Sequence, residues 1–119
     1  MSVRACVVSF RSGDRAVRAC RSALSAGAEV VLVDNSPGDG TADLVRESLP
    51  GVRVLSAPRN LGFAAGCNLG ARDAESDHLL FLNPDAELDP GALEALTRAL
   101  EDHPGAGIAG PALRFPERS

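Results

Sequence analysis

The stretch Glu29-Val30-Val31-Leu32-Val33-Asp34 decides the fold class of this 119-residue chain. Its four central residues are apolar without interruption, which is typical of a strand buried on both faces of a parallel sheet. Helical patterns flank this run. Asp14–Ala26 repeats apolar side chains every three or four residues and stops at Gly27, and Ala42–Leu49 stops at Pro50. We therefore predict a helix–strand–helix unit around the run.

The same alternation continues outward in both directions. Further strands are predicted at Val3–Phe10, Val52–Ser56, His78–Asn83 and, as a short final strand, Ala106–Ala109. Further helices are predicted at Leu61–Ala74 and Ala92–Glu101. This order predicts an α/β fold with three αβα layers, a mostly parallel sheet and right-handed crossovers. The length suits one domain over residues 1–119 with one core.

Two helix starts carry N-cap candidates. Thr41 follows the loop Asn35–Gly40 and suits the N-cap of the helix after it. Asp89 stands directly before Pro90, and proline is favoured at the first position of a helix. We predict that Thr41 and Asp89 cap their helices.

The charge pattern excludes a nucleic-acid partner. The net charge is −4, and all twelve basic residues are Arg. These arginines are scattered along the chain, whereas phosphate neutralisation needs clustered cations. Cys6, Cys20 and Cys67 have neither disulfide-framework nor metal-knuckle spacing, so we expect small buried thiols.

The chain has no apolar run near the ~18 residues of a membrane span, and Met1–Phe10 lacks the form of a signal peptide. We expect a cytoplasmic protein, and attachment to the inner face of a membrane stays open as an alternative.

Ligands of parallel sheets bind beyond the carboxyl ends of the strands, so polar residues that follow the predicted strands are site candidates. They are Ser9, Asp34, Asn35, Arg59, Asn60, Asn83 and Asp85. Asp34 can accept hydrogen bonds from a base N–H or a ribose hydroxyl. The alternative is that Asp34 and Asn35 only form an Asx turn. The position beyond a strand end favours ligand contact for Asp34.

Asn60–Asn68 is a second loop-to-helix junction with small residues. Gly62 and Gly66 let a ligand approach the backbone, and a helix N-terminus there favours an anion. Alternatively, both glycines only permit close packing of the helix on the sheet. The segment by itself does not distinguish these interpretations.

Asn83-Pro84-Asp85-Ala86-Glu87 follows the predicted fourth strand. In an extended backbone, side chains two residues apart project to the same side, so Asn83 and Asp85 would share a site. Mg²⁺ and Mn²⁺ favour one or two carboxylates with phosphate oxygens and water. Asp85 is the main candidate ligand, Asn83 offers an amide oxygen, and Glu87 is a third candidate. The alternative is an acidic turn before the Pro90 helix.

Gly105–Gly110 spells GxGxxG, the pattern of dinucleotide-binding loops. That pattern must follow a strand and open a helix. Here a helix precedes it and Pro111 follows, so we reject a dinucleotide site.

Four segments together resemble the amino-terminal half of a family 2-type, GT-A fold glycosyltransferase, close to a bacterial rhamnosyltransferase-like branch that acts in cell-wall polysaccharide biosynthesis. They are Val8–Phe10, Val33–Thr41, Asn60–Asn68 and Leu80–Leu88. They occur in the family's order and at its approximate spacing, over nearly the whole chain.

The resemblance implies a role for each donor-site candidate. Ser9, Asp34 and the adjacent Asn35 would belong to the nucleoside pocket; Asn60, Gly62 and Asn68 would lie along the ribose and diphosphate. Asn83 and Asp85 would match the two acids of the DxD metal motif, and Glu87 would be a further ligand of Mg²⁺ or Mn²⁺. Asn83 in place of an acid removes one charge from that motif.

The activity implied by the resemblance is transfer of a sugar, with rhamnose as our guess, from a dTDP- or UDP-linked donor to a glycan or lipid-linked acceptor with inversion. The family's catalytic base lies beyond the part that this chain matches, and Gly110–Ser119 contains only Glu117 as an acid. We therefore assign no catalytic residue and expect donor binding with little transfer.

Two alternative functions stay open from the sequence, together with one expectation about oligomeric state. One is a non-catalytic nucleotide-binding module, or pseudoenzyme, that acts through a partner. Another is a flavodoxin-like or response-regulator domain, but the latter needs a distal Lys and the chain has none. An open sheet edge would also favour a homodimer, because unpaired strands seek partners.

Overall fold

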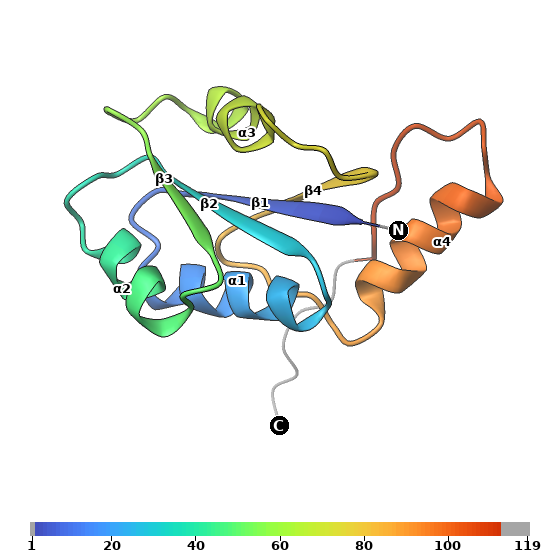
Figure 1. Cartoon of the computed structure of the whole chain (residues 1–119), viewed down its shortest axis with the longest axis horizontal. Coiled ribbons are helices and arrows are strands. Elements are labelled where there is room, and N and C mark those ends of the chain that lie inside the picture. Colours follow the sequence, from blue (N-terminus) through green and yellow to red (C-terminus); the bar gives the residue numbers. More distant parts are fainter. Residues whose placement is uncertain (1, 113–119) are drawn as a thin grey trace.

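The structure is a computed structural model that describes residues 2–112. Its elements follow in the order β1 (Val3–Ser9), α1 (Asp14–Ser25), β2 (Glu29–Asp34), α2 (Thr41–Ser48), β3 (Arg53–Ser56), α3 (Phe63–Ala71), β4 (His78–Leu82) and α4 (Ala92–Asp102). The four-stranded sheet has the order β3-β2-β1-β4, and all neighbouring strands are parallel. Helix α3 covers one face, α1 and α2 cover the other, and α4 stands to one side (Figure 1). The predicted αβα architecture is confirmed.

Strand β2 is buried on both faces, as its continuous apolar run predicts. Val30 and Leu32 join the core on the face of α1, whereas Val31 and Val33 pack with Val8 on the face of α3. All four β2 residues are at most 1% exposed. The sequence pattern therefore reflects real two-sided burial.

Helix α3 lies close to the sheet because two of its residues have no side chain. A Cβ added at Gly66 would lie 2.6 Å from Val8 Cγ1, and one at Gly70 would lie 3.2 Å from Cys6 Sγ. Tight helix–sheet packing, one of the two interpretations of this segment, holds for Gly66. Gly62 differs, because it has a φ of 84° and nothing within contact distance of an added Cβ.

The cysteines are free thiols of the core or its margin. Cys6 and Cys20 are buried and Cys67 is half-buried. Burial raises the pKa of the Cys6 thiol to about 11 and that of Cys20 to about 12. These two thiols are therefore protonated near neutral pH, as expected for small apolar core residues.

Both N-cap predictions are wrong. The residues at the N-cap positions of α2 and α4 are Gly40 (φ 91°) and Gly91 (φ 82°), so Thr41 is the first residue of α2 and Asp89 lies before a turn. Thr41 is instead a buried link, because its Oγ1 accepts a hydrogen bond from Gly13 N at 3.0 Å. A left-handed conformation suits glycine and strains threonine or aspartate, and it decides both positions.

The predicted strand Ala106–Ala109 does not form. These residues lie outside the sheet, and the Ile108 side chain is 92% exposed. A strand needs a neighbour for its backbone groups, and the three surrounding glycines provide no side chains to pack. The element directly before the GxGxxG pattern is helix α4, whereas a dinucleotide-binding loop directly follows a strand.

In the described part of the chain, no helix combines the length and the hydropathy needed to cross a membrane.

Candidate functional site

The carboxyl ends of the strands lie along one edge of the sheet. Strand β1 is central, with Ser9 beside Asp34 of β2 and Val7 beside Leu82 of β4. Residues that follow β1 therefore lie between the end of β2 and the end of β4. This order places the predicted nucleoside side and the predicted metal side on opposite flanks of β1.

Asp34 ends β2 and is 1% exposed. Its Oδ1 accepts hydrogen bonds from Ser36 N at 2.9 Å and from Ser36 Oγ at 3.3 Å, so the Asx turn does form. Asp34 also lines a cavity of about 200 Å³. The other lining residues are Pro37, Gly38, Gly40, Ala42, Asp43, Arg46 and Ser56. The carboxylate thus shapes the loop through one oxygen, and the other makes no hydrogen bond within residues 2–112.

Asn35 holds three segments together at this edge. Its Nδ2 donates to Gly62 O at 3.0 Å, its Oδ1 lies 3.4 Å from Leu61 N, and its backbone N donates to Ser9 O at 2.8 Å. The side chain is 2% exposed. In this geometry the amide supports the loop before α3 and is not turned out toward solvent.

The segment before α3 begins the helix without a side-chain cap. Asn60 Oδ1 accepts a hydrogen bond from Gly62 N at 2.9 Å, which forms a second Asx turn. Gly62 is the N-cap of α3 and has no side-chain cap hydrogen bond. The first amide groups of α3 therefore remain available to an anion. Asn68 is exposed in the middle of this helix.

Ser9 lies beneath the edge. It is 0% exposed, and its Oγ has no hydrogen-bond partner in the structure. A buried hydroxyl without a partner is uncommon in native proteins. Ser9 thus lies at the end of β1, where it was predicted, but its side chain is buried.

The chain turns sharply after β4. Ala86 N donates to Asn83 O at 3.1 Å, so Asn83–Ala86 is a β-turn with Pro84 at its second position. The expected extended backbone, with Asn83 and Asp85 on one side, is therefore wrong, because proline at this position favours a turn. Both side chains are exposed at the carboxyl edge.

Glu87 lies on the segment that leaves this edge along α1. Its Oε2 is 4.0 Å from Arg18 Nε, and the next residue, Leu88, donates its backbone N to Ser22 Oγ at 3.0 Å. Within residues 2–112, no three His, Cys, Asp or Glu side chains gather closely enough to hold a metal ion. Of Asn83, Asp85 and Glu87, Asp85 is thus the acid that lies at the turn. A single carboxylate together with phosphate oxygens and water fits the coordination that Mg²⁺ prefers.

Sequence reasoning missed two features. Arg11, directly after Phe10, has a φ of 53° and holds its guanidinium carbon 4.9 Å from the Phe10 ring centroid. Asp39 accepts a hydrogen bond from Ser36 Oγ at 2.7 Å and one from Thr41 N at 2.9 Å. Burial raises the pKa of Asp39, but these hydrogen bonds outweigh it and the pKa lies below its ordinary value. No local sequence pattern marks either feature.

A cavity of about 440 Å³ lies at the opposite edge. It is lined by Ser2, Val3, Arg4, Gly27, Glu29, Asp73, Glu75 and Ser76, at the amino ends of β1 and β2. Size alone would favour this cavity, but ligands of parallel sheets bind at the carboxyl edge, so we place the candidate site there.

Known proteins match nearly the whole chain. The family model "Glycosyl transferase family 2" covers residues 5–118. The chain belongs to glycosyl transferase family 2.

Two curated relatives extend this result. An N-acetylglucosaminyl-diphospho-decaprenol L-rhamnosyltransferase of Mycobacterium tuberculosis is 37% identical over 101 residues, which is 76% of this chain and 33% of that protein. An uncharacterized protein of the same species is 32% identical over 111 residues, 90% of this chain and 34% of that protein. The chain thus spans about a third of the length of these family 2 relatives.

Solved structures confirm the fold. The crystal structure of Staphylococcus aureus TarS 1-349 superposes with a TM-score of 0.75 at 20% identity and covers 98% of this chain and 40% of that chain. TarS in complex with UDP gives a TM-score of 0.74 at 19% identity, over 92% of this chain and 38% of that chain. The family 2 chain therefore has the GT-A fold predicted from its motifs.

Proposed function

We propose that this chain binds the nucleoside diphosphate of a sugar donor along the carboxyl edge of its sheet and forms the donor-binding part of a glycosyltransferase. The observation that carries the proposal is the order along that edge. Asp34, the uncapped start of α3 and the Asp85 turn follow the parallel strands whose fold is shared with TarS, a protein solved with UDP. We assign no catalytic base within residues 2–112.

Each part of the edge has a role in this proposal. Asp34 receives hydrogen bonds from the nucleoside, and Ser9 and Asn35 support that pocket from below. Gly62 and the α3 amides face the diphosphate, with Asn60 and Asn68 beside it. Uncapped amides at a helix start attract phosphate through hydrogen bonds and the helix dipole.

Asp85 is the residue proposed to hold Mg²⁺ or Mn²⁺, with Asn83 as a neutral partner and Glu87 as a weaker candidate because of Arg18. A bound divalent cation would neutralise the charge of the departing nucleoside diphosphate. Since the turn presents a single well-placed carboxylate, we expect metal affinity to depend on the donor phosphates.

The donor and acceptor are proposed from the rhamnosyltransferase relative. We propose that a sugar, preferably rhamnose, is transferred with inversion from a dTDP- or UDP-linked donor to a glycan or lipid-linked acceptor. A nucleotide-binding role without catalysis is the second candidate, favoured by the absence of any three-residue acidic or His cluster for a metal within residues 2–112.

Calorimetry with UDP and dTDP, with and without Mn²⁺, tests the donor site. We expect binding that Mn²⁺ strengthens, loss of that strengthening in Asp85→Asn, and weaker nucleotide binding in Asp34→Asn. Glu47→Gln, which removes an exposed acid in the last turn of α2 that does not line the Asp34 cavity, is the matched control and should change neither. Absence of binding by the wild-type chain would refute the donor site, and sugar transfer by the purified chain would refute the second candidate.

A further inference from the structure

Arg11 is the one described non-glycine residue with a positive φ, at 53°. The left-handed region is unfavourable for a side chain with a Cβ, so this conformation costs free energy. Arg11 lies in the loop that directly follows the end of β1. Strain of this kind persists where the surrounding structure imposes it, and it is frequent at ligand sites.

The strained backbone is tied to the end of β2. Arg11 N donates to Ser36 Oγ at 2.9 Å, and Ser36 is bound in turn to Asp34 Oδ1 and Asp39 Oδ2. The loop after β1 is thus fixed to the turn that contains Asp34. This hydrogen bond fixes the point at the carboxyl edge from which the Arg11 side chain extends.

The Arg11 guanidinium is exposed and forms no ion pair with a carboxylate of residues 2–112. Its only described side-chain contact is the Phe10 ring, 4.9 Å from centroid to guanidinium carbon, and that ring is itself 48% exposed. By contrast, Arg4, Arg18, Arg46, Arg53 and Arg98 form ion pairs. A cation that rests on an exposed ring is held weakly and can be given up to an anion.

The strand order places this cation between the two ends of the donor. In the order β3-β2-β1-β4, the loop after β1 lies between Asp34 on β2 and the Asp85 turn after β4. Arg59 follows β3 at the outer edge and is farther from the Asp85 side in that order. If the nucleoside lies at β2 and the metal at β4, the diphosphate crosses in front of Arg11.

We propose that Arg11 is a donor-binding residue that pairs with the diphosphate of the nucleotide sugar, so that the phosphates do not depend for positive charge on a metal held by a single carboxylate. The inference rests on the proposed donor site and adds a residue to it. It implies that nucleoside diphosphate binds measurably even without a divalent cation.

Two substitutions in the full chain separate binding from folding. Arg11→Gly removes the side chain and relieves the strained φ, so the thermal midpoint should stay or rise. Arg11→Gln keeps length and polarity without charge. In EDTA, we expect both substitutions to raise the Kd about tenfold for whichever of UDP and dTDP binds the wild type more tightly. Tenfold is the size of one charge-assisted contact. Affinity for the matching free nucleoside, measured by NMR titration, should not change.

Arg72→Gln is the matched control, because Arg72 is exposed beyond the far end of α3 and has no ion pair within residues 2–112. It should bind like the wild type. If both Arg11 variants bind the nucleoside diphosphate within twofold of the wild type, the inference is wrong while the donor site stands. Equal loss of nucleoside and nucleoside diphosphate would also overturn it, since the effect would then be on the pocket. A wild-type chain that binds neither diphosphate refutes both proposals.

Discussion

At the scale of single residues, one glycine and the side chains of an aspartate and an asparagine do most to shape the candidate site. Gly66 permits α3 to lie on the sheet, and Asp34 and Asn60 close Asx turns at the carboxyl edge. Asp34 builds its own loop with one oxygen, so the Asx turn is confirmed, and it borders a cavity of about 200 Å³. Its contact with a ligand stays a prediction.

Gly66→Ala should destabilise the chain by about 1–3 kcal/mol, because the new methyl group would overlap the stiff Val8 side chain at 2.6 Å. Urea unfolding measures the change. Gly51→Ala is the control, since Gly51 is exposed and an added Cβ meets nothing within 4 Å. Equal stability of the two variants would show that α3 can shift without cost.

Asp73 gives stability a dependence on acid pH. Hydrogen bonds from Arg4 and Arg53 lower the pKa of this carboxyl to about 2 in the folded state, from an ordinary value of 3.8. Between these values the unfolded chain binds the proton and the folded chain does not. The stabilising contribution is therefore complete above about pH 4 and is lost as pH falls toward 2.

Asp73→Asn should flatten that part of the profile. Chemical denaturation from pH 5 to pH 2 should show a smaller loss of stability in the variant than in the wild type. Asp43→Asn is the comparison for removing an exposed acid elsewhere. Parallel profiles for wild type and Asp73→Asn would contradict the role of the Arg4–Asp73 contact.

At the scale of elements, a buried arginine anchors the far end of α3. Arg4 is 4% exposed and donates to Gly70 O at 3.0 Å, Asp73 Oδ1 at 2.7 Å and Glu29 Oε1 at 2.8 Å. These hydrogen bonds, with burial opposing them, raise the pKa of Arg4 further above its ordinary value. The helix whose start faces the proposed donor site is thus fixed at its other end.

Arg4→Met should lower stability by about 1–3 kcal/mol, since it removes hydrogen bonds between charged groups. Amide exchange should rise most in α3. Arg98→Met breaks an exposed pair with Glu94 within α4 and should change stability by less than about 0.5 kcal/mol. A uniform rise in exchange across the sheet would argue against a local anchor.

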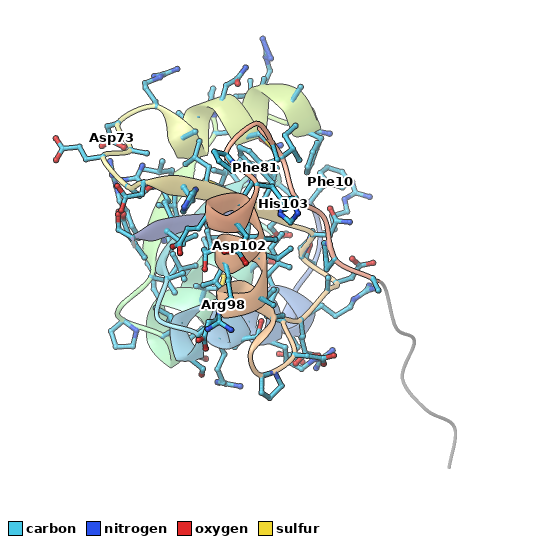
Figure 2. The ribbon with its side chains drawn as sticks, turned by 90° about the vertical axis from the view of Figure 1, so that its right-hand side faces the viewer. Phe10, Asp73, Phe81, Arg98, Asp102 and His103 are labelled. Carbon is cyan, nitrogen blue, oxygen red and sulfur yellow. The ribbon has the colours of Figure 1, made fainter. Side chains whose placement is uncertain are left out.

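At the scale of the whole molecule, β4 forms an edge strand with apolar side chains. Leu79 and Phe81 are 44% and 47% exposed, and His78–Leu82 contains neither proline nor an acidic or basic residue other than histidine. Figure 2 shows Phe81 on the side of the molecule between α3 and α4. Natural edge strands usually carry charges or proline against pairing with another chain.

We predict that the chain forms a concentration-dependent homodimer through β4. Antiparallel pairing of two copies centred on Leu80 would place Leu79 of one copy opposite Phe81 of its partner. Light scattering should show the dimer, and Phe81→Lys should shift it to monomer. Ile108→Lys, which changes a 92% exposed residue off the sheet, is the control. A monomer at every concentration would exclude this pairing.

The local sequence was sufficient for the elements of the fold, and its limits have a physical cause. The four strands and four helices follow from apolar periodicity, because burial on one or two faces imposes that period. The segment at Ala106–Ala109 has strand-like composition but no neighbouring strand, and pairing is not a local property. Gly40 and Gly91 occupy the N-cap positions because the chain enters α2 and α4 with a positive φ there.

By itself, the sequence determined the alternation of strands and helices, the family, and the polar residues that follow each strand. Only the tertiary structure decided how those residues are used. It buried Ser9 and Asn35, paired Glu87 with Arg18 and placed Arg11 at the edge. These outcomes depend on contacts between segments far apart in the chain, so local pattern cannot specify them.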